Sequence, residues 1–113
     1  MTLTGKRLDG LLIQGSIARK EMLELAIKHR LPTLTTIRLG PQLGALASYG
    51  SDYLALAHQS AVYVDKILKG AKLADLPVVF PTTFLLIINL KTAKALGLAV
   101  PLPLLGRADE TIE

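Results

Sequence analysis

The sequence contains no cysteine, which excludes disulfide bonds, thiol catalysis and thiolate metal sites and leaves the redox compartment open. Aromatic residues are scarce, with two phenylalanines, three tyrosines and no tryptophan, so the core must be built from aliphatic side chains. No apolar run approaches the roughly 20 residues that a transmembrane helix needs. The first ten residues, MTLTGKRLDG, lack the apolar segment of a signal peptide, so we expect none.

The sequence also lacks the residue patterns of catalytic and metal sites. Its two histidines, His29 and His58, fall inside predicted helices without a carboxylate at metal-ligand spacing. Asp52, Asp65 and Asp75 do not alternate as the ligands of a calcium loop do. The glycine spacings match neither a dinucleotide-binding nor a phosphate-binding loop. Because no nucleophile, base and oxyanion site come together, we expect no enzyme activity, no cofactor and no metal.

The charge of the chain gives little indication of its partner. Thirteen basic and nine acidic residues give a net charge of +4, but the basic residues are spread among helix ends and loops. Nucleic-acid binding favours a clustered basic stripe with interleaved aromatic residues, so we expect none here. A length of 113 residues, of which 50% are hydrophobic, favours one α/β domain over residues 1–113.

Hydrophobic patterning indicates strands and helices in the order β-α-β-β-α-β-α, followed by a short helical turn. The strands are predicted at Leu11–Ile13, Thr33–Ile37, Ala45–Ser48 and Phe84–Asn89, the helices at Ala18–His29, Ser51–Lys69 and Lys91–Leu96, and the turn at Leu104–Glu110. Such alternation predicts an α/β fold with a mainly parallel sheet flanked by helices. Residues 71–83 contain two prolines and no helical periodicity, which predicts a crossing loop.

Residues with capping side chains or no side chain flank the predicted helices. Ser16, Ser51 and Asn89 stand just before the three helices and are good N-cap residues. Gly70 and Gly97 follow two of the helices, where a left-handed residue commonly ends the helix.

The helix predicted from Ser51 to Lys69 has a wider apolar face than a surface helix usually shows. Two neighbouring stripes of apolar residues run along it at three-four spacing. We therefore expect this helix to be covered by another layer or by a second subunit, and we predict a homodimer. The side chains at risk of exposure in a monomer are Leu54, Leu56, Val64, Ile67 and Leu68.

A small-molecule site is predicted at the carboxyl ends of the strands, where open α/β sheets bind ligands. The candidate ligand-binding residues are Gln14, Gly15, Ser16, Arg38, Ser48, Tyr49 and Gly50. The glycines allow close approach of the backbone, the serines can hydrogen-bond a polar ligand, Tyr49 can stack on it, and Arg38 can hold a carboxylate. Three of these residues also have a structural interpretation: Ser16 as a helix cap, Arg38 as a solvated loop residue and Tyr49 as a packing residue.

Several separated blocks of the chain together resemble one protein family. The blocks ELAIKHRLPT, ASYGSDY, YVDKILKGAK, INLKTAKALGL and LLGRADETIE keep their order and spacing over about Asp9–Glu113. They resemble the C-terminal part of ABC-transporter substrate-binding proteins related to the tryptophan/tyrosine-binding group. In this family the segments matching Gln14–Ser16 and Ser48–Gly50 face the cleft between two lobes. The loop Ile37–Leu43 departs from the family pattern, although Arg38 matches a common basic position there.

The resemblance implies a partial lobe of the periplasmic-binding-protein type I-like fold, with hinge crossings at residues 71–83 and at the SYG segment. It implies capture of a small solute for an ABC importer, with importer membrane subunits as partners and a periplasmic or extracytoplasmic location. Amino acids, particularly aromatic ones, are ligands of relatives, but no residue of this sequence selects one. The chain is either a fragment or a natural half-length protein, which would be cytoplasmic without a signal peptide. The alternative function is a half-length, self-associating structural or interaction module that binds no solute.

Overall fold

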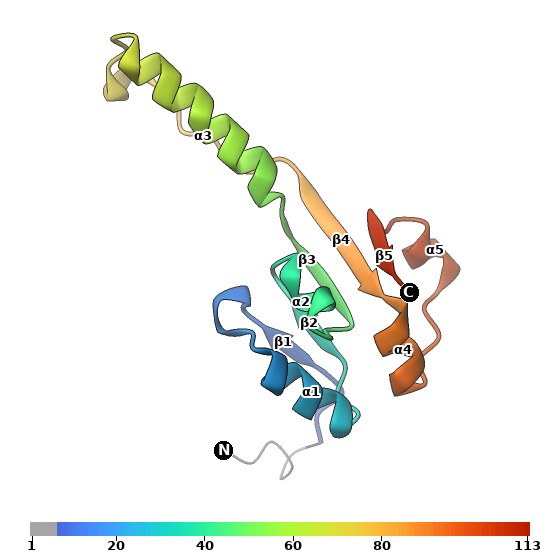
Figure 1. Ribbon diagram of the computed structural model, residues 1–113. Coiled ribbons are helices and arrows are strands. Elements are labelled where there is room, and N and C mark those ends of the chain that lie inside the picture. Colours follow the sequence, from blue (N-terminus) through green and yellow to red (C-terminus); the bar gives the residue numbers. More distant parts are fainter. Residues whose placement is uncertain (1–6) are drawn as a thin grey trace. The chain divides into compact units, whose positions relative to one another are not determined.

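The computed structural model describes residues 7–113 (Figure 1). They form two compact units, of which the first combines the chain up to Gly50 with Leu85–Glu113, and the second is Ser51–Phe84. The signal-peptide prediction concerned residues 1–10, of which the first six lie outside the described part. Within residues 7–113, no helix combines the length and the apolar character that a membrane crossing requires.

The strands form one five-stranded sheet in the order β1-β2-β3-β4-β5. They are β1 (Leu11–Ile13), β2 (Thr33–Thr35), β3 (Ala47–Ser51), β4 (Phe84–Asn89) and β5 (Glu110–Ile112). The pairs β1–β2, β2–β3 and β4–β5 are parallel. The remaining neighbours, β3 and β4, run in opposite directions, because Asn89 N–H donates to Leu46 O (2.8 Å) and Asp52 N–H donates to Thr83 O (3.0 Å). The prediction of a mainly parallel sheet with flanking helices is confirmed.

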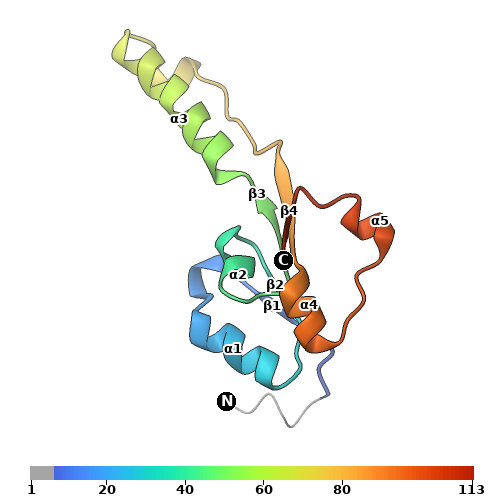
Figure 2. The same ribbon diagram turned by 45° about the vertical axis from the view of Figure 1, so that its right-hand side comes forward.

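Short helices connect the strands of the first unit, and one long helix dominates the second. The helices are α1 (Lys20–Lys28), α2 (Leu39–Gln42), α3 (Tyr53–Leu68), α4 (Leu90–Leu96) and α5 (Leu102–Leu105), with 3-10 turns at Gly15–Ile17 and Leu73–Asp75. In the first unit, α1 and α4 contact each other. Figure 2 shows that the chain forms α4 and α5 between β4 and β5. Ile13, Ala18, Leu23 and Ala45 form the main apolar cluster of this unit.

Strand β4 has the bounds that its apolar run predicts, but only part of it is buried. Ile87 and Ile88 are 1% and 2% exposed on successive positions, so the carboxyl half of the strand is covered on both faces. Phe84, at the other end, is exposed. Burial on both faces is thus confirmed only where β4 lies within the first unit.

Two of the three predicted N-caps are wrong. Ser16 lies inside the 3-10 turn, and α1 begins at Lys20 after Arg19, which makes no side-chain cap. Ser51 still belongs to β3, and the α3 cap is Asp52, whose carboxylate accepts from the N–H groups of Leu54 and Ala55 at 3.0 and 3.2 Å. A carboxylate that satisfies two N–H groups at once, at the positive end of the helix, competes well with a hydroxyl one residue earlier.

The other helix-end predictions are confirmed. Asn89 caps α4 by accepting a hydrogen bond from Thr92 N–H (2.9 Å). Gly97 and Gly70 follow α4 and α3 with positive φ values of 70° and 101°. Such backbone conformations cost little for glycine and end the helix.

Several element bounds differ from those predicted. The predicted loop after β2 contains α2, β2 ends at Thr35 rather than at Ile37, and β3 covers Ala47–Ser51 instead of Ala45–Ser48. The predicted turn at Leu104–Glu110 is replaced by the end of α5, a short loop and the start of β5. β5 is only three residues long and contains a single large apolar side chain, Ile112, so its pattern is too short to indicate a strand.

Candidate ligand-binding edge of the sheet

Five chain segments meet at one edge of the sheet. The carboxyl ends of β1, β2 and β3 point to this edge, and the amino ends of β4 and β5 join them because these two strands run the other way. We call it the carboxyl edge. Within the first unit it comprises the segments Gln14–Ser16, Thr36–Arg38, Ser48–Gly50, Leu85–Leu86 and Asp109–Glu110.

Thr36 lies at the centre of the carboxyl edge, between the two glycines predicted there. Gly15 N–H donates to Thr36 Oγ1 at 3.0 Å. A Cβ atom on Gly50 would overlap the carbonyl oxygen of Thr36, and a Cβ atom on Gly15 would lie 2.9 Å from Ile37 Cβ and closer still to that residue's outer carbons. Both glycines are therefore required by close approach of neighbouring chain segments, and the ends of β1, β2 and β3 are drawn tightly together.

The remaining candidate residues on β1 and β3 differ in accessibility. Gln14 and Ser16 are exposed beside the buried Gly15. Ser48 is 2% exposed, in register with Thr35 of β2, so its hydroxyl lies inside the fold. The next residue, Tyr49, points to the opposite face, as alternation along a strand requires, and its side chain is 55% exposed. Of the β3 candidates, Tyr49 is thus the side chain that a solute can reach.

Arg38 forms an ion pair that the sequence did not indicate. Its Nη2 group donates to Glu110 Oε2 at 2.7 Å, and the two side chains are 51% and 37% exposed. Neighbouring Asp109 accepts a hydrogen bond from Leu86 N–H through Oδ2 (2.8 Å), which fixes the start of β5 beside β4. Sequence reasoning missed Glu110 because β5 was not predicted, so nothing placed this residue at the carboxyl edge.

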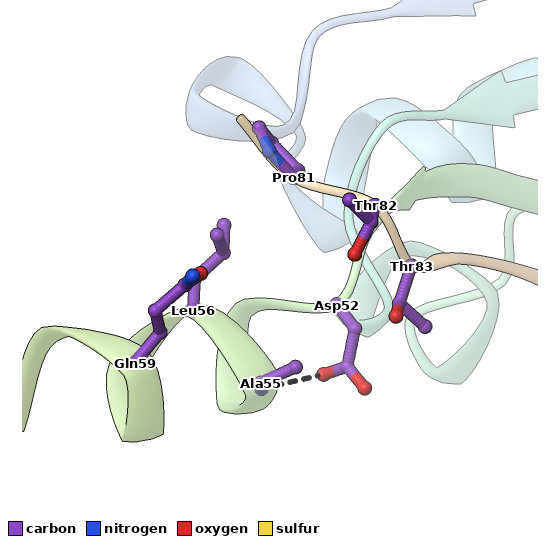
Figure 3. A pocket seen from close by; sticks show the side chains of 7 residues that line it. All are labelled: Asp52, Ala55, Leu56, Gln59, Pro81, Thr82 and Thr83. Carbon is purple, nitrogen blue, oxygen red and sulfur yellow. Dashed lines mark hydrogen bonds between the residues drawn. The ribbon is translucent and has the colours of Figure 1, made fainter. Parts of the chain in front are cut away.

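The second unit has a hollow of its own beside the first turn of α3 (Figure 3). It is small, with a cavity volume of about 30 Å³, and is lined by Asp52, Ala55, Leu56, Gln59, Pro81, Thr82 and Thr83. The Asp52 carboxylate is engaged by the helix N–H groups, which Figure 3 shows for Ala55. This hollow was not predicted, and its one charged side chain already serves as a helix cap.

Metal ligands are not brought together in the part of the chain that the structure describes. Between residues 7 and 113, no group of three or more histidines or acidic residues lies close enough to hold a metal ion. The carboxyl edge offers a solute an exposed tyrosine and a partly exposed, paired arginine. Such a set can hydrogen-bond and orient a polar molecule, which is how binding sites fix a ligand.

Comparison with known proteins identifies a family. The family model described as ABC transporter substrate binding protein matches residues 12–112. A conserved domain protein from Vibrio cholerae is similar over 91% of this chain, with 30% sequence identity and a TM-score of 0.84. A protein from Streptococcus pneumoniae, solved as an ABC domain in complex with L-Trp, is similar over 94% of the chain, with 28% identity and a TM-score of 0.81.

A more distant structure shares the fold. It is the ligand-free, open form of a substrate-binding protein with adhesive properties from Clostridium difficile, 22% identical over 94% of this chain with a TM-score of 0.67. The chain spans 36–38% of the length of these three proteins. No match to a curated protein sequence was found.

Proposed function

Because the chain belongs to the ABC transporter substrate-binding protein family, we propose that it binds a small solute at the carboxyl edge as part of the solute-binding component of an ABC importer. In this proposal the chain supplies the C-terminal portion of a two-lobed receptor, in an extracytoplasmic location. The receptor captures the solute in the cleft between its lobes and passes it unchanged to the importer membrane subunits. No catalytic step is involved.

The accessible side chains of Tyr49 and Arg38 at the carboxyl edge are the observation that best supports a binding site here. They lie where α/β sheets bind ligands, at the carboxyl ends of parallel strands. The exposed Tyr49 and Arg38 flank the glycines and can add stacking and charge. The pneumococcal neighbour was solved with L-Trp, which makes amino acids, including aromatic ones, the first solutes to test.

A titration followed by ¹H–¹⁵N NMR tests this function. We expect an amino acid from a panel that includes L-tryptophan to shift the amide signals of Gly15, Thr36 and Gly50. We expect an affinity near the millimolar range, about −4 kcal/mol, because this chain forms only one wall of the cleft and solute sites normally bury most of the ligand. The amide of Gly97, at the far end of α4, is the internal control and should not shift.

Two results would contradict the proposal. Signals that shift only in α3, or at no residue of the carboxyl edge with any solute of the panel, would argue against a site at this edge. Sub-micromolar binding by the chain alone would contradict the expectation that half of the cleft is missing.

Self-association through α3 is the second candidate function, and the exposure of the apolar side chains on this helix favours it. None of the 16 residues from Tyr53 to Leu68 is buried. Leu54, Val64 and Leu68 are 65%, 55% and 81% exposed, although their spacing makes one stripe. Covering such side chains contributes roughly 25 cal/mol per Å² of apolar surface, so pairing two copies of the stripe is favourable. A two-fold dimer is the simplest assembly that covers both.

Sedimentation equilibrium at micromolar concentration measures this association. We expect a species of twice the 12.1 kDa chain mass that dissociates on dilution. Val64→Lys should shift the equilibrium to the monomer, whereas Val62→Lys should not, because residues two apart on a helix point to nearly opposite faces. A monomer at every concentration, with a cooperative melting transition, would count against the dimer.

A further inference from the structure

The ion pair between Arg38 and Glu110 differs from the other ion pairs of the described residues. Lys20–Glu24 and Asp65–Lys69 each join neighbouring turns of one helix. Arg38 and Glu110 are 72 residues apart and join the segment after β2 to the first residue of β5. The pair therefore depends on the assembled sheet, and it lies at the carboxyl edge where the solute is proposed to bind.

The pair is both accessible and only partly satisfied. The Arg38 guanidinium has five N–H groups in a planar fork, and the hydrogen bond to Glu110 uses Nη2 and Oε2. The Arg38 side chain is about half exposed, and that of Glu110 is a little more than one third exposed. Exposed ion pairs of this kind contribute little to stability, so either partner can exchange onto a ligand group at small cost.

An α-amino acid carries the same two charges on adjacent groups. Its carboxylate fits the guanidinium fork through two parallel hydrogen bonds, and its ammonium group fits a carboxylate such as that of Glu110. A molecule with both charges can separate the Arg38–Glu110 pair and leave neither side chain unpaired. A molecule with only one of the charges can pair with only one of the two side chains and therefore forms fewer charge-assisted hydrogen bonds.

We propose that Arg38 and Glu110 together recognise the α-carboxylate and α-ammonium groups of a zwitterionic amino acid by exchanging partners with it. This inference rests on the proposed function. It adds Glu110 to the site and makes the charge pattern of the solute, rather than its side chain, the feature that these two residues select. The exposed side chain of Tyr49, at the same edge, is then left to contact the rest of the solute.

Three indole compounds that differ only in these charges test the inference on the unaltered chain. L-tryptophan has both charges, tryptamine lacks the carboxylate, and 3-indolepropionate lacks the ammonium group. In the NMR titration we expect L-tryptophan to bind at least tenfold more tightly than either analogue. Equal affinity for the three compounds would overturn this inference and leave the proposed function standing.

A variant in which Arg38 and Glu110 exchange their charges distinguishes recognition of the solute from a purely structural role of the ion pair. The double variant Arg38→Glu, Glu110→Arg keeps an ion pair between the same positions, so a purely structural pair predicts unchanged binding of L-tryptophan. Recognition predicts at least a tenfold loss, because each charged group of the solute now meets a like charge. Asp65→Asn, which breaks the ion pair on α3, is the matched control and should leave binding unchanged.

The remaining outcomes are also decisive. Unchanged L-tryptophan affinity in the charge-exchanged variant would overturn the inference, and should that variant fail to fold, the analogue series on the unaltered chain decides alone. An absence of shifts at the carboxyl edge with all three indoles would overturn the inference, whereas the proposed function is then judged by the other solutes of the panel.

Discussion

Gly50→Ala is expected to lower the free energy of unfolding by about 3 kcal/mol or more, at the upper end of what overpacking usually costs. The new Cβ atom would lie 2.9 Å from the carbonyl carbon of Thr36 and would overlap its oxygen. These are backbone atoms of the neighbouring segment, so no side-chain rotation can relieve the overlap. The chain after β2 or the end of β3 must move instead, and both belong to the carboxyl edge.

Gly97→Ala is the matched control for this substitution. Gly97 has open space around the position of a Cβ atom, but its φ of 70° is unfavourable for residues with side chains. We therefore expect a loss of about 1–2 kcal/mol, and Gly97→Asn should recover part of it because asparagine tolerates this region. Chemical denaturation followed by circular dichroism measures all three variants. If the two substitutions lowered the free energy of unfolding equally, the carboxyl edge would have to adjust to the new Cβ atom at little cost, contrary to the close approach described above.

The α/β architecture could be predicted because its main signals are local. The continuous apolar run of β4, the helix-ending glycines Gly70 and Gly97 and the Asn89 cap each stand within a few residues of the element they specify. Element bounds were less predictable where two neighbours competed for one role. Asp52 displaced Ser51 as the α3 cap for this reason, since a carboxylate that accepts two N–H groups was available one residue later.

The carboxyl edge could be predicted only in part. Parallel order brought the ends of β1, β2 and β3 together, and glycines at those ends marked close approach. The opposite direction of β4 and β5 was not readable from the sequence, because β5 is a three-residue strand without a distinct pattern. The partner of Arg38 therefore could not be foreseen. Nor could the central place of Thr36, which depends on the three-dimensional approach of Gly15 and Gly50.

The second large effect is expected for Asn89, which joins three parts of the first unit. Its Oδ1 atom accepts a hydrogen bond from Thr92 N–H at 2.9 Å, and its Nδ2 group donates to Pro41 O at 2.7 Å. The residue is 6% exposed, and its backbone N–H also donates to Leu46 O. One side chain thus caps α4 and holds the end of α2 next to it.

Asn89→Ala is expected to lower the free energy of unfolding by about 2–4 kcal/mol. Loss of the cap costs about 1 kcal/mol, and leaving the Pro41 carbonyl without its buried donor costs about 1–3 kcal/mol more. Asn89→Asp keeps the acceptor for Thr92 N–H but replaces the donor to Pro41 O with a second oxygen, so it isolates the second contribution. Both variants are measured by chemical denaturation followed by circular dichroism.

Asp52→Ala provides the comparison, because Asp52 caps α3 in a partly exposed position without a second, buried partner. Asp52→Ala should therefore lower the free energy of unfolding by only about 1 kcal/mol, the contribution of a cap alone. If Asn89→Ala costs no more than Asp52→Ala, the bond to Pro41 contributes nothing to stability. A stable Asn89→Asp variant would show the same, since a buried carboxylate facing a carbonyl oxygen is otherwise unfavourable. A large loss in both Asn89 variants with a small loss in Asp52→Ala would instead place the stabilisation in the Asn89–Pro41 contact, where α2 meets the start of α4.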